Sequence, residues 1–214
     1  MPSPKTVVQC DFDGTVTDRD VAFLMLDTFA RGDWHKIHKQ YEDGRITVGR
    51  FNEESFALVR ATREQLLSVI KGNINVRPGF KDLVACCRRK RFRLAVVSNG
   101  LDFYVESILK DLGVAGVEAH AARTTFQYDR VYVQYVGPDG KPMDDGFKEA
   151  YVRWFKGLGN RVVYIGNGTS DFRPARLCDM VFATDQLAWH CQRQRFDCRQ
   201  FDTFHDVVKV LETL

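Results

Sequence analysis

The sequence predicts an α/β fold in which a parallel sheet is interrupted, after its first strand, by a small all-helical segment. Three apolar runs support the sheet, and each ends in a polar cluster: residues 7–10 before 11–15, residues 94–97 before 98–100, and residues 162–165 before 166–171. Short apolar runs that alternate with helical patterns are typical of parallel strands joined by crossover helices. Ligands of such sheets bind beyond the carboxyl ends of the strands, so the three clusters predict one shared site.

Length and composition set the class of protein. The chain has 214 residues, of which 44% are hydrophobic and 28% charged, so one medium domain with a modest insertion is expected. No apolar stretch reaches the roughly 20 residues of a membrane span. Residues 1–5 contain no apolar signal region, which predicts a cytoplasmic protein with no membrane partner.

The charge gives little reason to expect a nucleic-acid partner. The net charge is only +3, and the one dense basic run, residues 88–91, falls where a helix should end. Cations at that position favour the helix dipole, which predicts a solvated helix terminus. The six cysteines lack the paired close spacings of a zinc site, and they predict free thiols.

The first strand ends in two carboxylates, Asp11 and Asp13. Side chains two positions apart on an extended segment point the same way, so both carboxylates can share one site. Such a pair repels itself unless a cation or a shared proton is present. Oxygen ligands of this kind suit Mg2+, which also binds phosphate oxygens of a substrate. The pair further supplies a nucleophile beside a general acid/base, as phosphoryl transfer through an aspartate requires.

A helical segment follows the first strand. Apolar residues at helical spacing predict helices, and Thr62 is a candidate N-cap of the last one. The four expected helices are residues 20–33, 34–41, 48–59 and 63–71. An insertion of this length exceeds a usual crossover connection. It predicts a separate helical unit from residue 18 to residue 76.

The remaining elements complete the sheet. A helix over residues 80–91 leads into the second strand, and residues 131–136 with the turn at 138–140 predict a small β excursion. A helix over residues 148–155, a buried strand at 180–183 and a closing helix over 206–214 follow.

Four motifs resemble those of the haloacid dehalogenase-like phosphatases. Residues 11–17, Asp-Phe-Asp-Gly-Thr-Val-Thr, match the first motif at every position, and Ser98, Lys148 and residues 166–171 match the second, third and fourth in order. The similarity covers essentially the whole chain. It implies a Rossmann-like core formed by residues 1–17 and 77–214 and a helical cap formed by residues 18–76. A cap inserted at this point marks the subgroup that contains phosphoserine phosphatase and the methylthiopentenyl-phosphate phosphatase of methionine salvage.

The resemblance implies a role for each matched residue. Asp11 is the nucleophile that becomes an aspartyl-phosphate, and Asp13 is the general acid/base, whose backbone carbonyl also binds Mg2+. Ser98 and Lys148 hold the transferring phosphoryl group, where their donors and charge offset developing negative charge. Backbone amides contribute further phosphate donors, at Gly14, Asn99 and Gly100.

The fourth motif departs from the family pattern at Asn167, where an aspartate usually binds Mg2+ directly. The amide keeps one oxygen donor but has no charge, so weaker metal binding is expected. Asp171, at the end of the motif, is expected to stabilise Lys148 or a metal-bound water. Lys141 and Lys156 remain alternatives to Lys148, which is preferred because it opens a helix about 20 residues before the last motif.

The substrate is expected to be a small phosphorylated metabolite. Asp20 occupies the place of a glutamate that lies near the substrate amine in phosphoserine phosphatases, whereas Ser55 replaces their carboxylate-binding arginine. That loss argues against phosphoserine, although Arg50 is a candidate substitute. The segments around residues 164–166 and 179–183 look closer to the methionine-salvage group, which makes a keto-enol methylthiopentenyl phosphate the named candidate.

Three other functions stay open. A phosphotransferase or phosphomutase shares the motifs but passes the phosphoryl group to an alcohol. A phosphoserine phosphatase remains possible through Arg50. A catalytically weakened phospho-ligand binding protein has Asn167 as its only support. Either a monomer or a homodimer is compatible with the sequence.

Overall fold

The computed structural model describes residues 5–214, so residues 1–4 of the expected core lie outside the description. Its main feature is an eight-stranded sheet with the order β5-β4-β3-β2-β1-β6-β7-β8. The central strand β1 (Thr6–Cys10) runs parallel to β2 (Arg93–Leu101) and β6 (Arg161–Gly166). The strands β7 (Met180–Ala183) and β8 (Arg199–Gln200) continue in parallel beyond β6. The predicted parallel α/β fold is therefore present, with an antiparallel extension described below.

The register aligns the carboxyl ends of β1 and β6, and β2 continues past both of them to Leu101. Cys10, the last residue of β1, lies opposite Val96 of β2 and Ile165 of β6. The amide of Asp11 then donates to the carbonyl of Ile165 at 2.9 Å. This pairing extends the alignment one residue past β1, so the first residue of the polar cluster starts from a fixed position.

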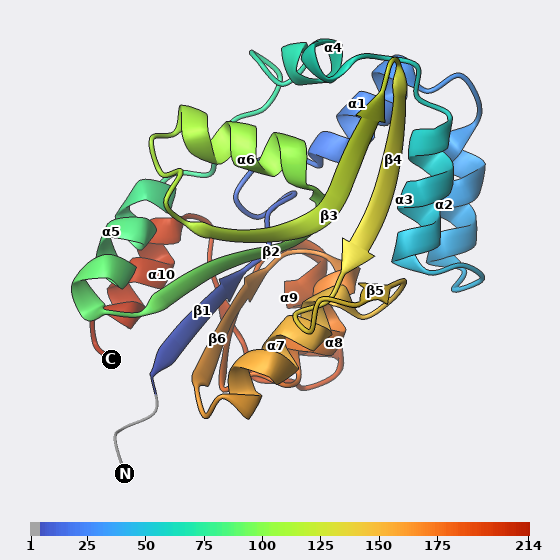
Figure 1. Cartoon of the computed structure of the whole chain (residues 1–214). Coiled ribbons are helices and arrows are strands. Elements are labelled where there is room, and N and C mark those ends of the chain that lie inside the picture. Colours follow the sequence, from blue (N-terminus) through green and yellow to red (C-terminus); the bar gives the residue numbers. More distant parts are fainter. Residues whose placement is uncertain (1–4) are drawn as a thin grey trace.

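Helices cover both faces of the sheet (Figure 1). One face carries α5 (Phe80–Lys90), α6 (Asp102–Asp111) and α10 (Phe204–Leu211), and α7 (Phe147–Gly157) and α8 (Phe172–Ala175) lie on the other. The short turn η1 (Thr169–Asp171) precedes α8, and α9 (Asp185–Arg193) follows β7. Val7, Val8 and Cys10 of β1 are at most 1% exposed, as expected of a parallel strand buried on both faces.

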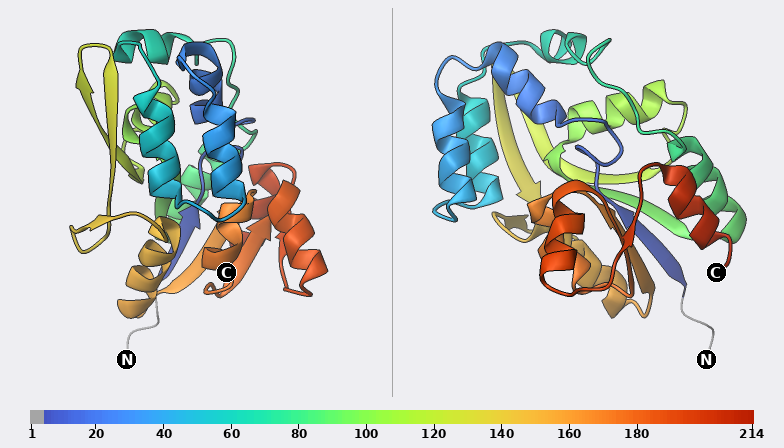
Figure 2. Two further views of the ribbon diagram at one scale, coloured as in Figure 1. Left: turned by 90° about the vertical axis from the view of Figure 1, so that its right-hand side faces the viewer. Right: turned by 180° about the vertical axis from the view of Figure 1, so that it is seen from behind.

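Four helices form the predicted helical segment, and they stand beyond the carboxyl end of β1 (Figure 2). They are α1 (Val21–Phe29), α2 (Trp34–Glu42), α3 (Val48–Ala57) and α4 (Arg63–Ser68). Each begins at a residue whose side chain accepts a hydrogen bond from the first turn, and Thr62 forms the expected cap with Gln65 in a reciprocal box. Such caps satisfy amides that have no partner inside the helix.

The β excursion is larger than the sequence predicts. Strand β3 (Glu118–Gln127) forms an antiparallel hairpin with β4 (Arg130–Val136), and β5 (Pro142–Met143) pairs with β4. The hairpin reaches the helical segment (Figure 1), where the amide of Ala61 donates to the carbonyl of Asp129 at 3.0 Å. The strand β3 has no apolar run because most of its side chains are only partly buried or exposed, so it lacks the sequence signal of a core strand.

Several boundaries differ from expectation. The first helix ends at Phe29 because Ala30 forms an antiparallel bridge with Val59. The closing helix spans Phe204–Leu211 instead of residues 206–214. Among residues 5–214, no helix combines the length and the apolar character needed to cross a membrane.

Candidate active site

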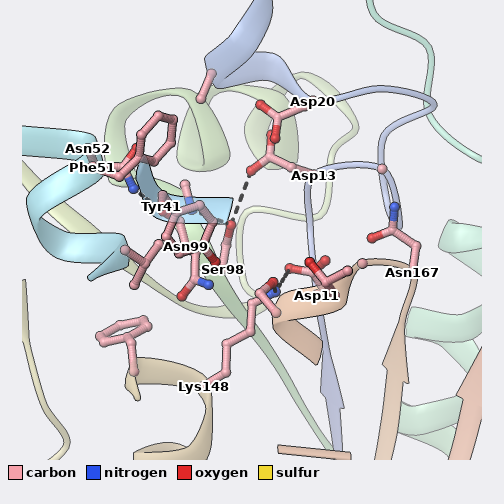
Figure 3. Close-up of a pocket in the computed structure, with 18 of the residues that line it drawn as sticks. Asp11, Asp13, Asp20, Tyr41, Phe51, Asn52, Ser98, Asn99, Lys148 and Asn167 are labelled. Atoms are coloured by element: carbon pink, nitrogen blue, oxygen red, sulfur yellow. Dashed lines mark hydrogen bonds and ion pairs between the residues drawn. The ribbon is translucent and has the colours of Figure 1, made fainter. Parts of the chain in front are cut away.

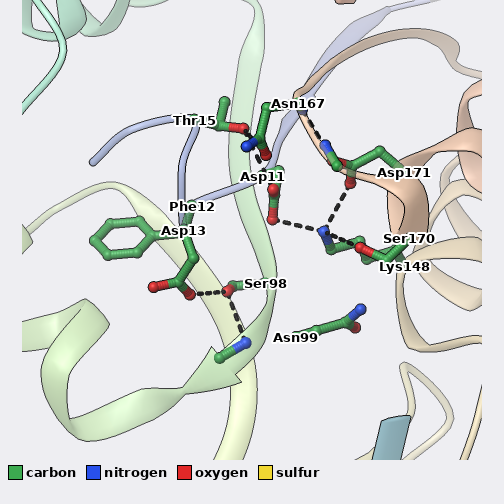
Figure 4. Close-up of polar contacts among 12 residues, drawn as sticks. Asp11, Phe12, Asp13, Thr15, Ser98, Asn99, Lys148, Asn167, Ser170 and Asp171 are labelled. Carbon is green, nitrogen blue, oxygen red and sulfur yellow. Dashed lines mark hydrogen bonds and ion pairs between the residues drawn. The ribbon is translucent and has the colours of Figure 1, made fainter. Parts of the chain in front are cut away.

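Asp11 lies one residue past β1, at the centre of the carboxyl edge of the sheet. Its Oδ1 is 2.6 Å from Nζ of Lys148, which comes from the first turn of α7. The same Nζ lies 2.7 Å from Oδ1 of Asp171, in the turn after β6. All three side chains are at most 5% exposed. One buried ammonium thus joins two carboxylates from different strands (Figure 4).

The charges of this cluster do not balance. Burial and the nearby Asp171 raise the pKa of Asp11 to about 7, although Lys148 opposes the change. Burial tends to lower the pKa of Lys148, but Asp11 and Asp171 outweigh it and raise that pKa. Burial tends to raise the pKa of Asp171, and the Lys148 charge outweighs it in the opposite direction. The lysine therefore stays charged, and Asp11 is the carboxylate left with an incomplete counter-charge.

Asp171 is fixed on three sides. Its Oδ1 accepts from the Tyr164 hydroxyl at 2.7 Å, and its Oδ2 accepts from the amides of Asn167 and Gly168 at 3.0 and 2.8 Å. A Cβ on Gly166 would lie 2.7 Å from Cγ of Asp171, so glycine is required at that position. These contacts orient Asp171 toward Lys148.

Asp13 has a different environment from Asp11. Its Oδ1 accepts from the amide of Val21, the first residue of α1, at 2.9 Å. Its Oδ2 accepts from the Tyr104 hydroxyl at 2.8 Å and from Oγ of Ser98 at 3.2 Å. Burial raises the pKa of Asp13, and these hydrogen bonds oppose the change. A carboxyl group with a raised pKa is suited to hold and release a proton.

The last part of β2 contributes Ser98, Asn99 and Gly100, so this strand continues past the apolar run of residues 94–97 that the sequence indicated. The amide of Gly100 donates to Oγ of Ser98 at 2.8 Å. A Cβ on Gly100 would overlap the Tyr104 hydroxyl and Oδ2 of Asp13. Residues 98–100 of β2 therefore pack directly against Asp13, and only glycine fits at position 100.

Gly14 lines the same pocket but its amide is engaged elsewhere. It has a φ of 74°, and its amide donates to Oγ1 of Thr17 at 3.2 Å. The Gly100 amide is likewise held by Ser98. A phosphoryl oxygen would have to replace these intramolecular bonds before either amide served as the predicted phosphate donor.

Asn167 faces Asp11 across the side chain of Thr15. The Thr15 hydroxyl lies 3.0 Å from Oδ1 of Asn167 and 3.3 Å from Oδ2 of Asp11. A single hydroxyl proton serves only one of these acceptors at a time, so the two oxygens converge with one donor between them. A cation ligated by oxygen fits this arrangement and the excess of buried carboxylates. No group of three His, Cys, Asp or Glu side chains with metal-site geometry occurs within residues 5–214, which agrees with an amide at position 167.

A pocket of about 810 Å³ opens above these residues (Figure 3). Its floor contains Asp11, Asp13, Ser98, Lys148 and Asn167. The helical segment supplies the opposite wall with aromatic and polar side chains, namely Asp20, Phe23, His38, Tyr41, Phe51 and Asn52. The structure thus brings sites far apart in the sequence to one cavity.

Of the three candidate specificity residues, Asp20 lines the pocket, whereas Arg50 and Ser55 do not. Asp20 lines the pocket and caps α1 through the amide of Phe23 at 2.8 Å. Arg50 is not among the lining residues, because its guanidinium binds Glu54 at 2.6 Å and Glu53 at 3.3 Å on the exposed side of α3. Ser55 is also outside the lining and is fully buried. The two alternative lysines lie elsewhere, Lys141 beside Asp139 and Lys156 beside Asp179.

Sequence reasoning did not identify several residues that hold the site. Tyr164 lies inside the apolar run of β6, and Tyr104 lies in the first turn of α6, four residues after Gly100. A tyrosine within a predicted buried strand is a usable signal, because its hydroxyl needs a partner. Asn52 lines the pocket from the middle of α3, and its partners, distant in sequence, left no such signal.

Comparison with known proteins agrees with this geometry. The family model of haloacid dehalogenase-like hydrolases matches residues 8–176. The chain is 28% identical to 2-hydroxy-3-keto-5-methylthiopentenyl-1-phosphate phosphatase of Brevibacillus brevis, over 98% of this chain and 96% of that protein. It is also 28% identical to the protein of the same name in Exiguobacterium sibiricum, over 96% of each chain.

A solved structure shares the fold. A phospho-aspartyl intermediate analogue of phosphoserine phosphatase superposes with a TM-score of 0.69 and 18% identity, covering 97% of this chain and 99% of that one. The match of the family model spans the first motif, Ser98, Lys148 and the fourth motif. The chain belongs to the haloacid dehalogenase-like hydrolases.

Proposed function

We propose that this protein is a Mg2+-dependent phosphomonoesterase that hydrolyses a small phosphorylated metabolite through an aspartyl-phosphate, the acyl phosphate of Asp11. The observation that carries the proposal is the position of Asp11. Its carboxylate lies 2.6 Å from Lys148 and shares one pocket with Asp13 and Ser98. A nucleophile, a cation for the phosphoryl oxygens and a proton donor therefore face one cavity.

The reaction divides into two transfers. In the first, an oxygen of Asp11 attacks phosphorus, the bond to the leaving oxygen breaks, and Asp13 gives its proton to the leaving alkoxide. In the second, Asp13 takes a proton from water, which attacks the same phosphorus and releases Asp11 and inorganic phosphate. Lys148 and Ser98 offset negative charge on the phosphoryl oxygens in both steps.

Asp11, the backbone carbonyl of Asp13 and Asn167 are the residues that would hold Mg2+. When bound, the ion supplies positive charge that neutralises the phosphoryl group and Asp11 together. Asp171 holds Lys148 in place at 2.7 Å. The convergence of Oδ2 of Asp11 and Oδ1 of Asn167 on one hydroxyl supports this assignment.

Residues 18–76 act as a cap in this proposal, and residues 1–17 and 77–214 act as the core. The cap wall of the pocket includes the rings of Phe23, His38, Tyr41 and Phe51. The aromatic rings in this wall suit a substrate with an apolar tail, and two relatives carry the name of a methylthiopentenyl-phosphate phosphatase. We therefore favour a methylthiopentenyl-phosphate-type substrate.

Phosphoserine is a weaker candidate. Arg50, the possible partner for its carboxylate, is bound to Glu53 and Glu54 outside the pocket. The arginines that do line the pocket are Arg19 and Arg173, and Arg173 is paired with Asp145 and Glu149. No specific contact favours the phosphotransferase or the binding-protein alternative.

Phosphate release from a panel of small phosphomonoesters, with and without Mg2+, tests the function. The panel contains phosphoserine, a methylthiopentenyl phosphate and simple alkyl phosphates, assayed with the wild type and with Asp11→Asn. Metal-dependent release that Asp11→Asn abolishes is expected, with the apolar-tailed ester turned over fastest. Transfer of phosphate to an added alcohol without free phosphate would instead identify a transferase, and no turnover at high Mg2+ would favour a binding protein.

A further inference from the structure

Two buried side chains outside the four motifs converge on one peptide near the carboxyl end of β2, the Asn99–Gly100 peptide. Nδ2 of Asn52, from the cap helix α3, lies 3.0 Å from the carbonyl oxygen of Asn99 and 2.6 Å from the Tyr135 hydroxyl. The Tyr135 hydroxyl, from β4, donates to the same carbonyl. Asn52 and Tyr135 are 3% and 2% exposed. We call this pair the Asn52–Tyr135 clamp.

The clamp fixes the orientation of the whole Asn99–Gly100 peptide unit and not only that of its carbonyl. Because a peptide unit is planar, holding the carbonyl of Asn99 also sets the direction of the Gly100 amide. That amide donates to Oγ of Ser98 at 2.8 Å, and Ser98 in turn donates to Oδ2 of Asp13 at 3.2 Å. The hydrogen bonds of the clamp and those of Ser98 are therefore connected through the Asn99–Gly100 peptide bond and lead to Asp13. Figure 3 labels Asn52, Asn99, Ser98 and Asp13, and Figure 4 shows the contact between Ser98 and Asp13.

The two parts of the clamp come from separate segments of the chain. Asn52 lies in the helical segment, whereas Tyr135 lies in the hairpin, where the edge of its ring packs on Phe147 at a centroid distance of 5.1 Å. Loss of either donor would leave buried polar atoms with fewer partners, which is costly away from water. Contacts from the helical segment and from the hairpin therefore both hold the Asn99–Gly100 peptide of β2.

We propose that Asn52 and Tyr135 are positioning residues for phosphoryl transfer, and this role rests on the proposed function. They hold the Asn99–Gly100 peptide so that the Ser98 hydroxyl remains directed at Asp13 and the phosphoryl group. Their hydrogen bonds go to Asn99 and to each other, whereas Lys148 binds Asp11 and Asp171. The clamp makes the alignment of the general acid/base depend on contacts with the cap helix.

The variants Tyr135→Phe and Asn52→Ala, and the double variant, test the clamp. Tyr135→Phe removes only a hydroxyl and so keeps the packing of the ring. The matched control is Asp144→Ala, which removes another contact of α3, the hydrogen bond from Thr47 to Oδ2 of Asp144 at 2.5 Å. The control leaves Asn99 and its donors untouched. Thermal unfolding of each variant establishes that it is folded.

Two measurements separate positioning from general stability. Amide hydrogen exchange of a peptide covering residues 97–103 is expected to rise by about fivefold or more in each clamp variant, because the carboxyl end of β2 opens locally. The kcat is expected to fall about tenfold with KM within about threefold, the signature of an interaction used in the transition state. The double variant should lose less than the product of the single losses, because both donors serve one acceptor. Asp144→Ala should change neither quantity.

Each outcome decides a different point. Unchanged exchange of residues 97–103 in Tyr135→Phe and Asn52→Ala would overturn the clamp. Faster exchange with unchanged kcat would overturn its positioning role. If the wild type releases no phosphate from any ester, the proposed function fails and the positioning role fails with it. Amide hydrogen exchange of residues 97–103 still decides whether the two side chains hold the Asn99–Gly100 peptide.

Discussion

The ammonium nitrogen of Lys148 lies 2.6 Å from Oδ1 of Asp11, with both side chains at most 5% exposed. At this distance the lysine is placed to touch any group transferred to Asp11. Asp171 accepts from the same nitrogen at 2.7 Å and so fixes its position. The pair joins the residue after β1 to the start of α7, so in the proposed function catalysis and stability depend on the same contact.

Replacing Lys148 by methionine should reduce both activity and stability. The variant keeps the length of the side chain but leaves Asp11 and Asp171 buried without their cation, which typically costs about 3–5 kcal/mol. Loss of a charge that stabilises the transition state should lower kcat by about 10²-fold or more. Urea unfolding and steady-state kinetics at saturating Mg2+ measure the two effects.

A double variant separates these effects. Adding Asp171→Asn to Lys148→Met removes the second buried charge, so part of the lost stability should return while kcat stays low. Recovery of activity together with stability would mean that Lys148 acts only through folding and does not contact the phosphoryl group.

The outline of the fold follows from local sequence signals, including strand β4 of the hairpin, but strand β3 does not. The buried strands β1, β2, β6 and β7 contain short apolar runs. The start of a helix such as α4 is indicated by its N-cap residue, Thr62. Strand β3 contains mostly alanine, threonine and charged residues. Its place is set by pairing with β2 and β4, which are contacts that its own composition does not encode.

The residues of the site likewise include some that the sequence predicts and others that it does not. Motif residues at strand ends predict that Asp11, Asp13 and Ser98 meet, because parallel strands align their carboxyl edges. Lys148 opens the helix α7, and its place in the site was predicted from the resemblance of its motif. The failure to predict Asn52 has a physical reason, since its hydrogen-bond partners are Asn99 and Tyr135 on other elements. The engagement of Arg50 by Glu54 follows from their i, i+4 spacing, and that pattern was available in the sequence.

Asn167→Asp should lower the Mg2+ concentration needed for activity. The new carboxylate would add a charge near Asp11, since both oxygens approach the Thr15 hydroxyl. A gain of about tenfold in metal affinity corresponds to about 1.4 kcal/mol. Activity as a function of Mg2+ and the shift of the melting temperature by Mg2+ both report it. Asn73→Asp, which adds the same charge on the exposed surface, is the control, and an unchanged Mg2+ dependence would show that Asn167 is not a ligand.

Gly100→Ala should impair catalysis more than folding. The added Cβ would overlap the Tyr104 hydroxyl and Oδ2 of Asp13, so Asp13 must move from its donors. We expect kcat to fall by about 10²-fold, because small misplacements of reacting groups are costly. Gly157→Ala is the matched control, since a Cβ there meets no atom within 4 Å. Near-normal kcat in Gly100→Ala would mean that the position of Asp13 does not limit the reaction.

Glu118 should make the stability of the protein depend on pH in the acid range. Burial tends to raise its pKa, but hydrogen bonds from His120 and Arg93 outweigh this effect and lower the pKa from 4.5 to about 2. Arg93 contacts both carboxylate oxygens, at 2.6 and 2.8 Å. The pair lies where β2 and β3 begin their parallel pairing, so its loss should weaken the start of β3.

The sign of the effect follows from the lowered pKa. The stabilisation is fully present above the unfolded pKa of about 4.5, and it is lost as the pH falls toward 2. Because the carboxylate is partly exposed, we expect a loss of only about 1–2 kcal/mol. Glu118→Gln should remove this part of the pH dependence, as measured by urea unfolding between pH 6 and about 3. Equal slopes of unfolding free energy against pH in the variant and the wild type would show that the Arg93–Glu118 pair does not contribute.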